Sequence, residues 1–137
     1  MKTLKLTLLI LVSFGMGELY QPKNVWITDA NFEKKISGHS SYGDDNPVVV
    51  VEFWADFNKQ NSFKEWNKLK GAKYYRADIK VNKVAKSKYR VRMAPTIIIF
   101  KRGERQASFK AGLDLILHAN TQDVQKAINK VNNESRY

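Results

Sequence analysis

The stretch that decides the fold is VVVVEFW, residues 48–54, which has a counterpart in TIIIF, residues 96–100. Both runs are apolar at nearly every position. A strand with one face in water alternates apolar and polar residues, whereas a strand buried on both faces does not. We therefore predict that both runs are central strands of one sheet, covered on each side by other elements.

Upstream of these strands, residues 25–27 predict a short strand. A short helix follows, because Phe32 and Ile36 are four residues apart and lie on one helical face. Thr28 or Asp29 is the expected cap of that helix, since both side chains accept hydrogen bonds from free backbone N–H groups. The chain thus enters the central strand through a β-α unit.

Downstream of residue 54, the hydrophobic spacing predicts a short helix that carries Phe63, Trp66 and Leu69. Further elements are expected as a strand at 73–79, a basic helix at 81–89, a hairpin strand at 105–111 and a last helix at 121–131. The order β-α-β-α-β-α-β-β-α predicts helices packed on a mixed sheet that closes with a hairpin.

Three segments resemble the thioredoxin family. VEFWADF (51–57) is similar to the family's strand leading into its active-site loop, and YRVRMAPT (89–96) with IIIFKRGE (97–104) resembles its proline loop, next strand and turn. FKAG (109–112) is similar to the final strand and glycine. The resemblance covers about 24–131. It implies an α/β thioredoxin-like domain at 18–137, with about five strands in a mixed central sheet and helices on both faces.

The chain departs from the family at the active-site loop. The Cys-x-x-Cys pair falls on Asn58 and Asn61, with Lys59 and Gln60 between them, and the sequence has no cysteine. The resemblance therefore implies the fold without dithiol chemistry. We expect Asn58 or Asn61 to cap the following helix, which should be truncated because the span to Asp78 is short.

Glu52 falls on the family's buried acidic position beneath the thiols. Desolvation raises the pKa of an unpaired carboxyl on a buried strand. Three interpretations stay open: a neutral or Lys-paired structural residue, part of a polar binding pocket, or a general acid. In the last case the chain would be an enzyme with a non-thiol site formed by Glu52 with Lys59 or Asn58.

Pro95 matches the family's cis-proline. The resemblance implies that this loop faces the active-site loop and pairs through its backbone with an extended peptide. The expected groove is lined by Trp54, Phe57, Met93, Ala94, Pro95 and Thr96. The alternative is a rigid turn that only orders the neighbouring strand.

Positive charge is concentrated in one segment. The chain has 24 Lys and Arg against 13 Asp and Glu, a net charge of +11, and residues 79–103 contain no acidic residue. The expected basic face consists of Lys80, Lys83, Lys86, Lys88, Arg90 and Arg92. This face is either a solvated surface or a docking site for an acidic protein or an anionic envelope lipid or polysaccharide. No nucleic-acid motif accompanies it, which argues against a nucleic-acid partner.

The N-terminus has the pattern of a signal peptide at 1–17. Lys2 and Lys5 precede an apolar run, and Gly15 and Gly17 suit the positions before a cleavage site. That run is shorter than the roughly 20 residues of a spanning helix, although an uncleaved anchor is the alternative. We therefore expect a protein exported to the periplasm or secreted, with membrane contact only through an uncleaved N-terminal segment.

The absence of cysteine excludes disulfides, thiolate nucleophiles and Cys-based metal sites. His39 and His118 are far apart in sequence, so we predict no metal and no cofactor. The apolar segment 113–117 is expected to pack on the core or to form a patch for a partner. The sequence predicts a redox-inactive module that binds a protein or peptide through the proline-loop groove or the basic face. An adaptor subunit that docks anionic partners is an alternative.

Overall fold

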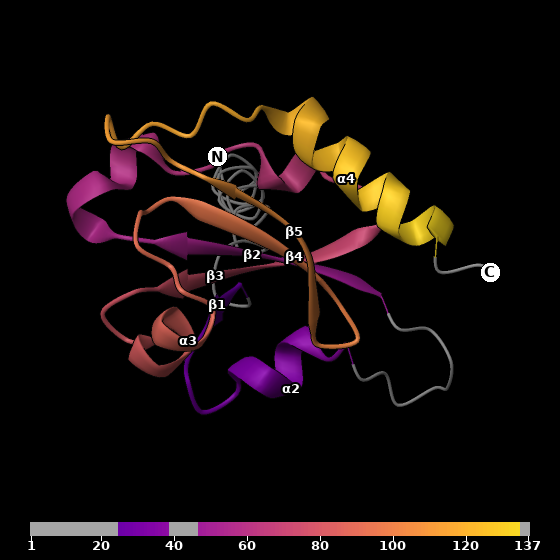
Figure 1. Cartoon of the computed structure of the whole chain (residues 1–137), viewed down its shortest axis with the longest axis horizontal. Coiled ribbons are helices and arrows are strands. Elements are labelled where there is room, and N and C mark those ends of the chain that lie inside the picture. Colours follow the sequence, from indigo (N-terminus) through magenta and orange to yellow (C-terminus); the bar gives the residue numbers. More distant parts are fainter. Residues whose placement is uncertain (1–24, 39–46, 135–137) are drawn as a thin grey trace, which may run out of the picture.

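The computed structural model describes residues 25–38 and 47–134. They form a five-stranded sheet with the order β1-β3-β2-β4-β5 (Figure 1). The central strand β2 (Val48–Trp54) is parallel to β3 (Ala72–Asp78) and antiparallel to β4 (Thr96–Lys101). At the edges, β1 (Trp26–Ile27) is parallel to β3, and β5 (Glu104–Lys110) is antiparallel to β4. The expected mixed sheet is confirmed.

Helices cover both faces of this sheet. In Figure 1, α4 (Thr121–Glu134) lies on one side, and α2 (Phe32–Ile36) and α3 (Lys83–Lys88) lie on the other. Alternate residues of β2 point into two separate cores: Val49 and Val51 pack with α2, and Val48 and Val50 pack with α4. This two-sided burial explains why residues 48–51 are apolar at every position.

The predicted helix with Phe63, Trp66 and Leu69 is wrong. Two short 3₁₀ helices, η3 (Asp56–Asn61) and η4 (Trp66–Lys68), occupy this part of the chain. The backbone N–H of Phe63 donates to Glu52 Oε2 over 2.9 Å, and Arg76 Nη2 donates to the Phe63 carbonyl over 3.1 Å. Because side chains take both backbone groups, the hydrogen-bond ladder of an α-helix cannot pass through Phe63.

The predicted cap of the first helix is also wrong. Asn31 occupies the N-cap position of α2 without a capping hydrogen bond. The Asp29 carboxylate instead accepts hydrogen bonds from the N–H groups of Val84 and Ala85, at 2.9 and 3.0 Å. Asp29 therefore caps α3, a helix more than fifty residues away in sequence.

The predicted signal peptide (1–17) and most of the predicted loop before β2 lie outside the described residues. Within residues 25–38 and 47–134, no helix combines the length and apolar character that crossing a membrane requires.

Candidate functional site

The Asn58 side chain links three segments through hydrogen bonds: η3, the proline loop and the loop after β5. Its side chain is only 6% exposed, at a kink in η3 where φ is −127° and ψ is 27°. The amide Nδ2 donates to the Ala94 carbonyl and to the Leu115 carbonyl, both over 2.8 Å. Asn61 Nδ2 in turn donates to Asn58 Oδ1 over 2.7 Å. Neither side chain caps a helix, so the capping role predicted for Asn58 or Asn61 is wrong; they join η3 to the proline loop and to the loop after β5.

The proline loop is largely closed. The Ala94–Pro95 peptide bond is cis, and Ala94, Pro95 and Thr96 are all buried. The family resemblance implies that this loop pairs with a peptide through its backbone, and here the Ala94 carbonyl accepts a hydrogen bond from Asn58. Met93, half-buried, is the accessible member of the four-residue loop. An extended peptide that paired with the Ala94 carbonyl would therefore share this acceptor with Asn58.

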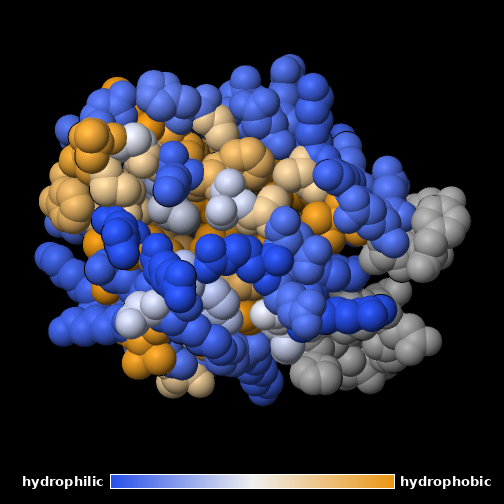
Figure 2. Space-filling view, in the orientation of Figure 1, coloured by the Kyte–Doolittle hydropathy of each residue, from blue (hydrophilic) through white to orange (hydrophobic). Residues whose placement is uncertain are grey.

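Three accessible apolar side chains lie on the proline loop or on the two segments that Asn58 joins to it. Phe57 on η3 is 66% exposed, and Leu113 in the loop after β5 is 97% exposed. Met93 and Leu113 line the same hollow. Figure 2 shows hydrophobic residues gathered at the upper left, over η3 and the loop that follows β5. We call Phe57, Met93 and Leu113 the apolar rim.

Trp54, the remaining member of the expected groove, is turned to another neighbour. Its ring packs edge-on against Trp26, with 5.1 Å between the ring centroids. The guanidinium of Arg76 lies 5.5 Å from the centroid of the Trp26 ring. Trp54, the last residue of the central strand β2, is half-buried in this arrangement, and its ring is turned toward β1.

Glu52 and Lys59 are not brought together. Glu52 is fully buried; its Oε1 accepts from Arg76 and from the Tyr74 hydroxyl, and its Oε2 accepts from the Phe63 N–H. Lys59 is exposed and lies 3.8 Å from Asp56. Gln60 on the same turn is exposed. The predicted non-thiol site around Glu52 and Lys59 is not assembled.

Burial is the largest influence on the pKa of Glu52. Desolvation raises its pKa, and the charge of Arg76 with the hydrogen bonds from Tyr74 and Phe63 opposes this rise without cancelling it. Burial also raises the pKa of Tyr74, and the Glu52 carboxylate adds to that shift. The group is a structural network that holds Phe63. Sequence reasoning missed Arg76 as the partner of Glu52, because the parallel register that places them opposite each other is known only from the structure.

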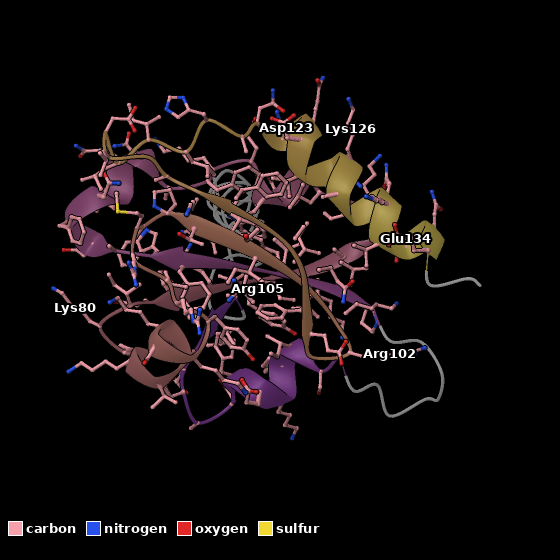
Figure 3. All side chains as sticks on the ribbon, viewed as in Figure 1. Lys80, Arg102, Arg105, Asp123, Lys126 and Glu134 are labelled. Carbon is pink, nitrogen blue, oxygen red and sulfur yellow. The ribbon has the colours of Figure 1, made fainter. Side chains whose placement is uncertain are left out.

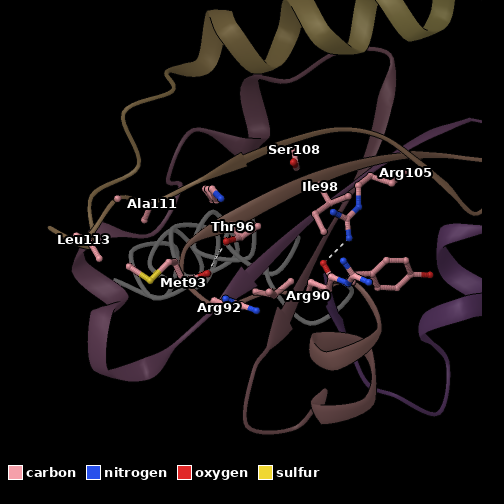
Figure 4. A pocket seen from close by; sticks show the side chains of 13 residues that line it. Arg90, Arg92, Met93, Thr96, Ile98, Arg105, Ser108, Ala111 and Leu113 are labelled. Carbon is pink, nitrogen blue, oxygen red and sulfur yellow. Dashed lines mark hydrogen bonds between the residues drawn. The ribbon is translucent and has the colours of Figure 1, made fainter.

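Beside the proline loop lies a basic hollow of about 550 Å³, drawn in Figure 4. Four cationic side chains line it, together with Thr96 and Ile98: Arg90, Arg92, Arg105 and Lys110. Arg105 Nη2 donates to the Tyr89 carbonyl, which fixes its guanidinium at the wall of the hollow. We call this the first hollow. Sequence reasoning missed Arg105 and Lys110, which lie on β5 beyond the basic segment.

A second hollow of about 700 Å³ adjoins the first and shares Arg90, Val91 and Arg92 with it. The lining cations of the second hollow are Lys80, Lys83, Lys86, Arg90 and Arg92. Lys88 is not among them, because its ammonium pairs with the Glu33 carboxylate. No acidic residue lines either hollow. Five of the six residues expected on the basic face thus lie around one depression.

Within the described segments, no group of three or more His, Asp or Glu side chains is placed to hold a metal ion. The histidine that the structure describes, His118, has its Nε2 3.0 Å from Asp114 Oδ2 in an exposed pair. The chemistry that these surfaces offer is recognition: apolar contact at the rim and charge complementarity in the hollows.

Solved structures with the same fold include several thioredoxins. A thioredoxin from Schistosoma mansoni is 23% identical, with a TM-score of 0.59 over 77% of this chain and 93% of that chain. A variant thioredoxin from Halobacterium salinarum is 20% identical, with a TM-score of 0.57 over 77% and 88%. The thioredoxin Mala s 13 from Malassezia sympodialis is 19% identical, with a TM-score of 0.56 over 77% and 87%. At this identity the likeness shows the fold alone.

No curated protein matches the chain. The family model described as Thioredoxin matches residues 23–123, most of the sequence. This match contains β1 to β5, the Asn58 loop and the proline loop. The expected α/β thioredoxin-like fold is confirmed, and the Cys-x-x-Cys pair is missing from it. The chain belongs to the thioredoxin family.

Proposed function

We propose that the protein is an exported, redox-inactive binding module that holds a protein or peptide partner at the proline-loop end of its sheet. The family's thiol–disulfide exchange requires a thiolate that attacks a disulfide sulfur. The chain has no cysteine, so it has neither the attacking nor the resolving thiol. The position of the first thiol is occupied by Asn58, whose amide is engaged with two carbonyls.

The observation that carries this proposal is the apolar rim. Leu113 is 97% exposed and Phe57 is 66% exposed, on two different segments that Asn58 joins to the proline loop. Exposed apolar side chains that are clustered and bordered by cations are typical of protein-binding surfaces. A structural turn alone would not require Leu113 and Phe57 to face water. The rim and the first hollow meet at Met93 and Leu113.

The enzymatic alternative is not supported by the geometry. Glu52 is sealed in the core with both carboxylate oxygens engaged, and the Lys59 ammonium lies on the surface beside Asp56. A general acid must reach the proton-accepting atom of a substrate. The adaptor alternative is favoured by one observation, namely the two adjoining basic hollows, and it concerns the same end of the molecule.

Selection of peptides from an unbiased displayed library tests the binding proposal. We expect the selected peptides to bind the Leu113→Asp variant about tenfold or more weakly than the wild type. The new carboxylate would have to lose its water against an apolar part of the peptide, which costs free energy. Val84→Asp is the matched control: Val84 is 69% exposed on α3 and lines neither hollow. Failure to select any peptide, or equal losses in both variants, would overturn the proposal.

The redox and export parts have separate tests. In an insulin-reduction assay with dithiothreitol, the protein should leave the uncatalysed rate unchanged, and any acceleration would contradict redox inactivity. For export, the protein recovered from outside the cytoplasm should begin at Glu18, as read by N-terminal sequencing. Recovery of the protein from the cytoplasm with Met1 intact would contradict export.

A further inference from the structure

We infer that the first hollow and the edge strand β5 together bind an extended acidic peptide, and that Arg90 selects for its carboxylates. This inference rests on the proposed function, because it names the chemical class of the partner at the same end of the molecule. It adds a binding surface beside the closed proline loop, from which Met93 and Thr96 line the hollow.

Three of the four cations of the first hollow have no carboxylate partner among the described residues. Within residues 25–38 and 47–134, no carboxylate forms an ion pair with Arg90, Arg92 or Lys110. Other exposed lysines do have such partners, for example Lys88 with Glu33 and Lys68 with Glu65. Like charges gathered around one concave surface repel each other, and an anionic ligand relieves that repulsion. The charge complement of this hollow is therefore a carboxylate-bearing ligand.

Arg90 is held in a conformation that favours glycine. Its φ is +56°, and it ends α3 by donating its N–H to the Ser87 carbonyl while the Val91 N–H donates to the Lys86 carbonyl. Glycine is the usual residue at this position after a helix, because a Cβ in the left-handed region has a steric cost. The chain bears this cost at Arg90, whose side chain lines both hollows, as that of Arg92 also does. The strain is explained if the side chain binds a ligand.

Arg105 supplies a second, fixed guanidinium. One of its nitrogens donates to the Tyr89 carbonyl, and its guanidinium carbon lies 5.7 Å from the centroid of the Tyr89 ring. A guanidinium has five N–H donors, so several remain for a ligand. Figure 4 shows Arg105 and Arg90 on the same side of the hollow, with Met93 and Leu113 at its other end. A ligand along this hollow thus meets cations first and apolar side chains next.

The edge strand gives the ligand its expected backbone. β5 pairs with β4 and lies at the end of the sheet order, so one of its sides has ladder groups without a strand partner. Ser108 and Lys110 of β5 line the first hollow, while Ala107 and Phe109 face the core under α4. Side chains alternate between faces along a strand. A strand added to β5 therefore places every second side chain over the hollow, and those positions should be acidic.

Shape favours a peptide over a lipid surface. The hollow is concave, and its floor contains Thr96 and Ile98 rather than a row of projecting lysines. A bilayer is flat on this scale and would contact only the tips of exposed cations. An extended chain can enter the hollow and form backbone hydrogen bonds at the same time. Tighter binding to anionic vesicles than to an acidic peptide would therefore contradict the inference.

The experiment uses three labelled peptides of equal length. The first alternates Glu with Val, the second replaces each Glu with Gln, and the third is the first with its backbone N-methylated on the side facing β5. We expect the full-length protein to bind the first peptide and to bind the other two about tenfold or more weakly. Added salt should weaken binding of the first peptide, because it screens the charges.

Two matched variants isolate Arg90. Arg90→Gly and Arg102→Gly each remove one positive charge and one non-glycine residue with positive φ, +56° and +54° respectively. Arg102 lies at the β4–β5 turn, labelled in Figure 3, and lines neither hollow. We expect Arg90→Gly to lose about tenfold or more in affinity for the acidic peptide, and Arg102→Gly to bind as the wild type does. Both variants should unfold at denaturant concentrations no lower than the wild type.

Equal loss in both variants, equal binding of the Gln peptide, or tighter binding to phosphatidylglycerol vesicles than to the acidic peptide would overturn the inference. Equal binding of the N-methylated peptide would overturn the pairing with β5. These failures differ from failure of the proposed function. If the unbiased library yields peptides without acidic residues that depend on Leu113 and not on Arg90, the partner site stands and the acidic-peptide inference falls.

Discussion

The side-chain amide of Asn58 donates a hydrogen bond to the carbonyl of Ala94 over 2.8 Å, across 36 residues of sequence. Where the family has the first thiol of its dithiol, this protein has a buried amide that holds the proline loop and the loop after β5. At this position a hydrogen-bonding amide stands in place of the family's reactive thiol. These hydrogen bonds hold η3, the proline loop and the loop after β5 together at this end of the sheet.

The hydrogen bonds of the Asn58 amide predict a large loss of stability when this donor is removed or replaced by an acceptor. Asn58→Ala leaves two carbonyls without their donor, and we expect the free energy of unfolding to fall by about 1–3 kcal/mol. Asn58→Asp should cost more, because a carboxylate would face the Ala94 and Leu115 carbonyls. Urea denaturation measures both. Asn61→Ala, which removes a donor to Asn58 only, is the milder comparison; an Asn58→Asp variant as stable as wild type would contradict the role.

Restoring the cysteine pair should not restore the family's reactive thiolate. A thiolate is stabilised at an α-helix N-terminus, and here η3 is a short 3₁₀ segment with a kink at Asn58. In the double variant Asn58→Cys with Asn61→Cys, we expect the thiol at position 58 to keep a pKa near about 8.5. Ultraviolet absorbance of the thiolate against pH measures it. A pKa well below 7 would show that the loop supplies its own stabilisation.

The buried network around Glu52 predicts graded stability losses. Glu52→Gln keeps an acceptor for the Phe63 N–H, and we expect a loss of about 1–3 kcal/mol. Glu52→Leu removes every acceptor and leaves the Arg76 guanidinium unpaired, so we expect about 3–5 kcal/mol. Denaturant titration distinguishes them. A leucine variant more stable than the glutamine variant would show that desolvation of the pair outweighs its hydrogen bonds.

The raised pKa of Glu52 has a predicted pH signature. The folded protein holds the carboxyl proton more tightly than the unfolded chain, whose pKa is near 4.5. The resulting stabilisation is complete below that pH and is lost as the pH rises through the folded pKa. The stability difference between wild type and Glu52→Gln should therefore shrink with rising pH above 4.5. Urea midpoints over a pH series test this; a difference that grows with pH would mean a lowered pKa.

The β4–β5 turn predicts a stabilising substitution. Arg102 and Gly103 both have positive φ, +54° and +79°, as two-residue hairpin turns require. Asparagine tolerates this region better than arginine, so Arg102→Asn should raise the free energy of unfolding by about 0.5–1 kcal/mol. Thermal and urea denaturation measure the gain. Asparagine at the exposed position 106, in place of Gln106 on β5, is the control and should give no gain.

The sequence by itself determined the sheet and the absence of the family's cysteine pair. Residues 48–54 and 96–100 are apolar at nearly every position because both faces of their strands are buried, and this local pattern needs no contact information. The missing cysteines are likewise visible without a structure. The hairpin turn and the final helix follow from short-range signals in the same way.

Only the tertiary structure decided the site. Phe63 lies in a region with helical spacing, but Glu52 and Arg76 take its backbone groups, and those partners come from two other strands. The sequence predicts that Asn58 caps a helix, but its side-chain amide donates hydrogen bonds to carbonyls 36 and 57 residues away. Arg105 and Lys110 join the cations of the basic segment around the first hollow, because antiparallel pairing places β5 beside the proline loop. Long-range hydrogen bonds and strand pairing outweigh the local preference of a segment for a helix or a cap. A single sequence does not show which distant residues will lie close together in the fold.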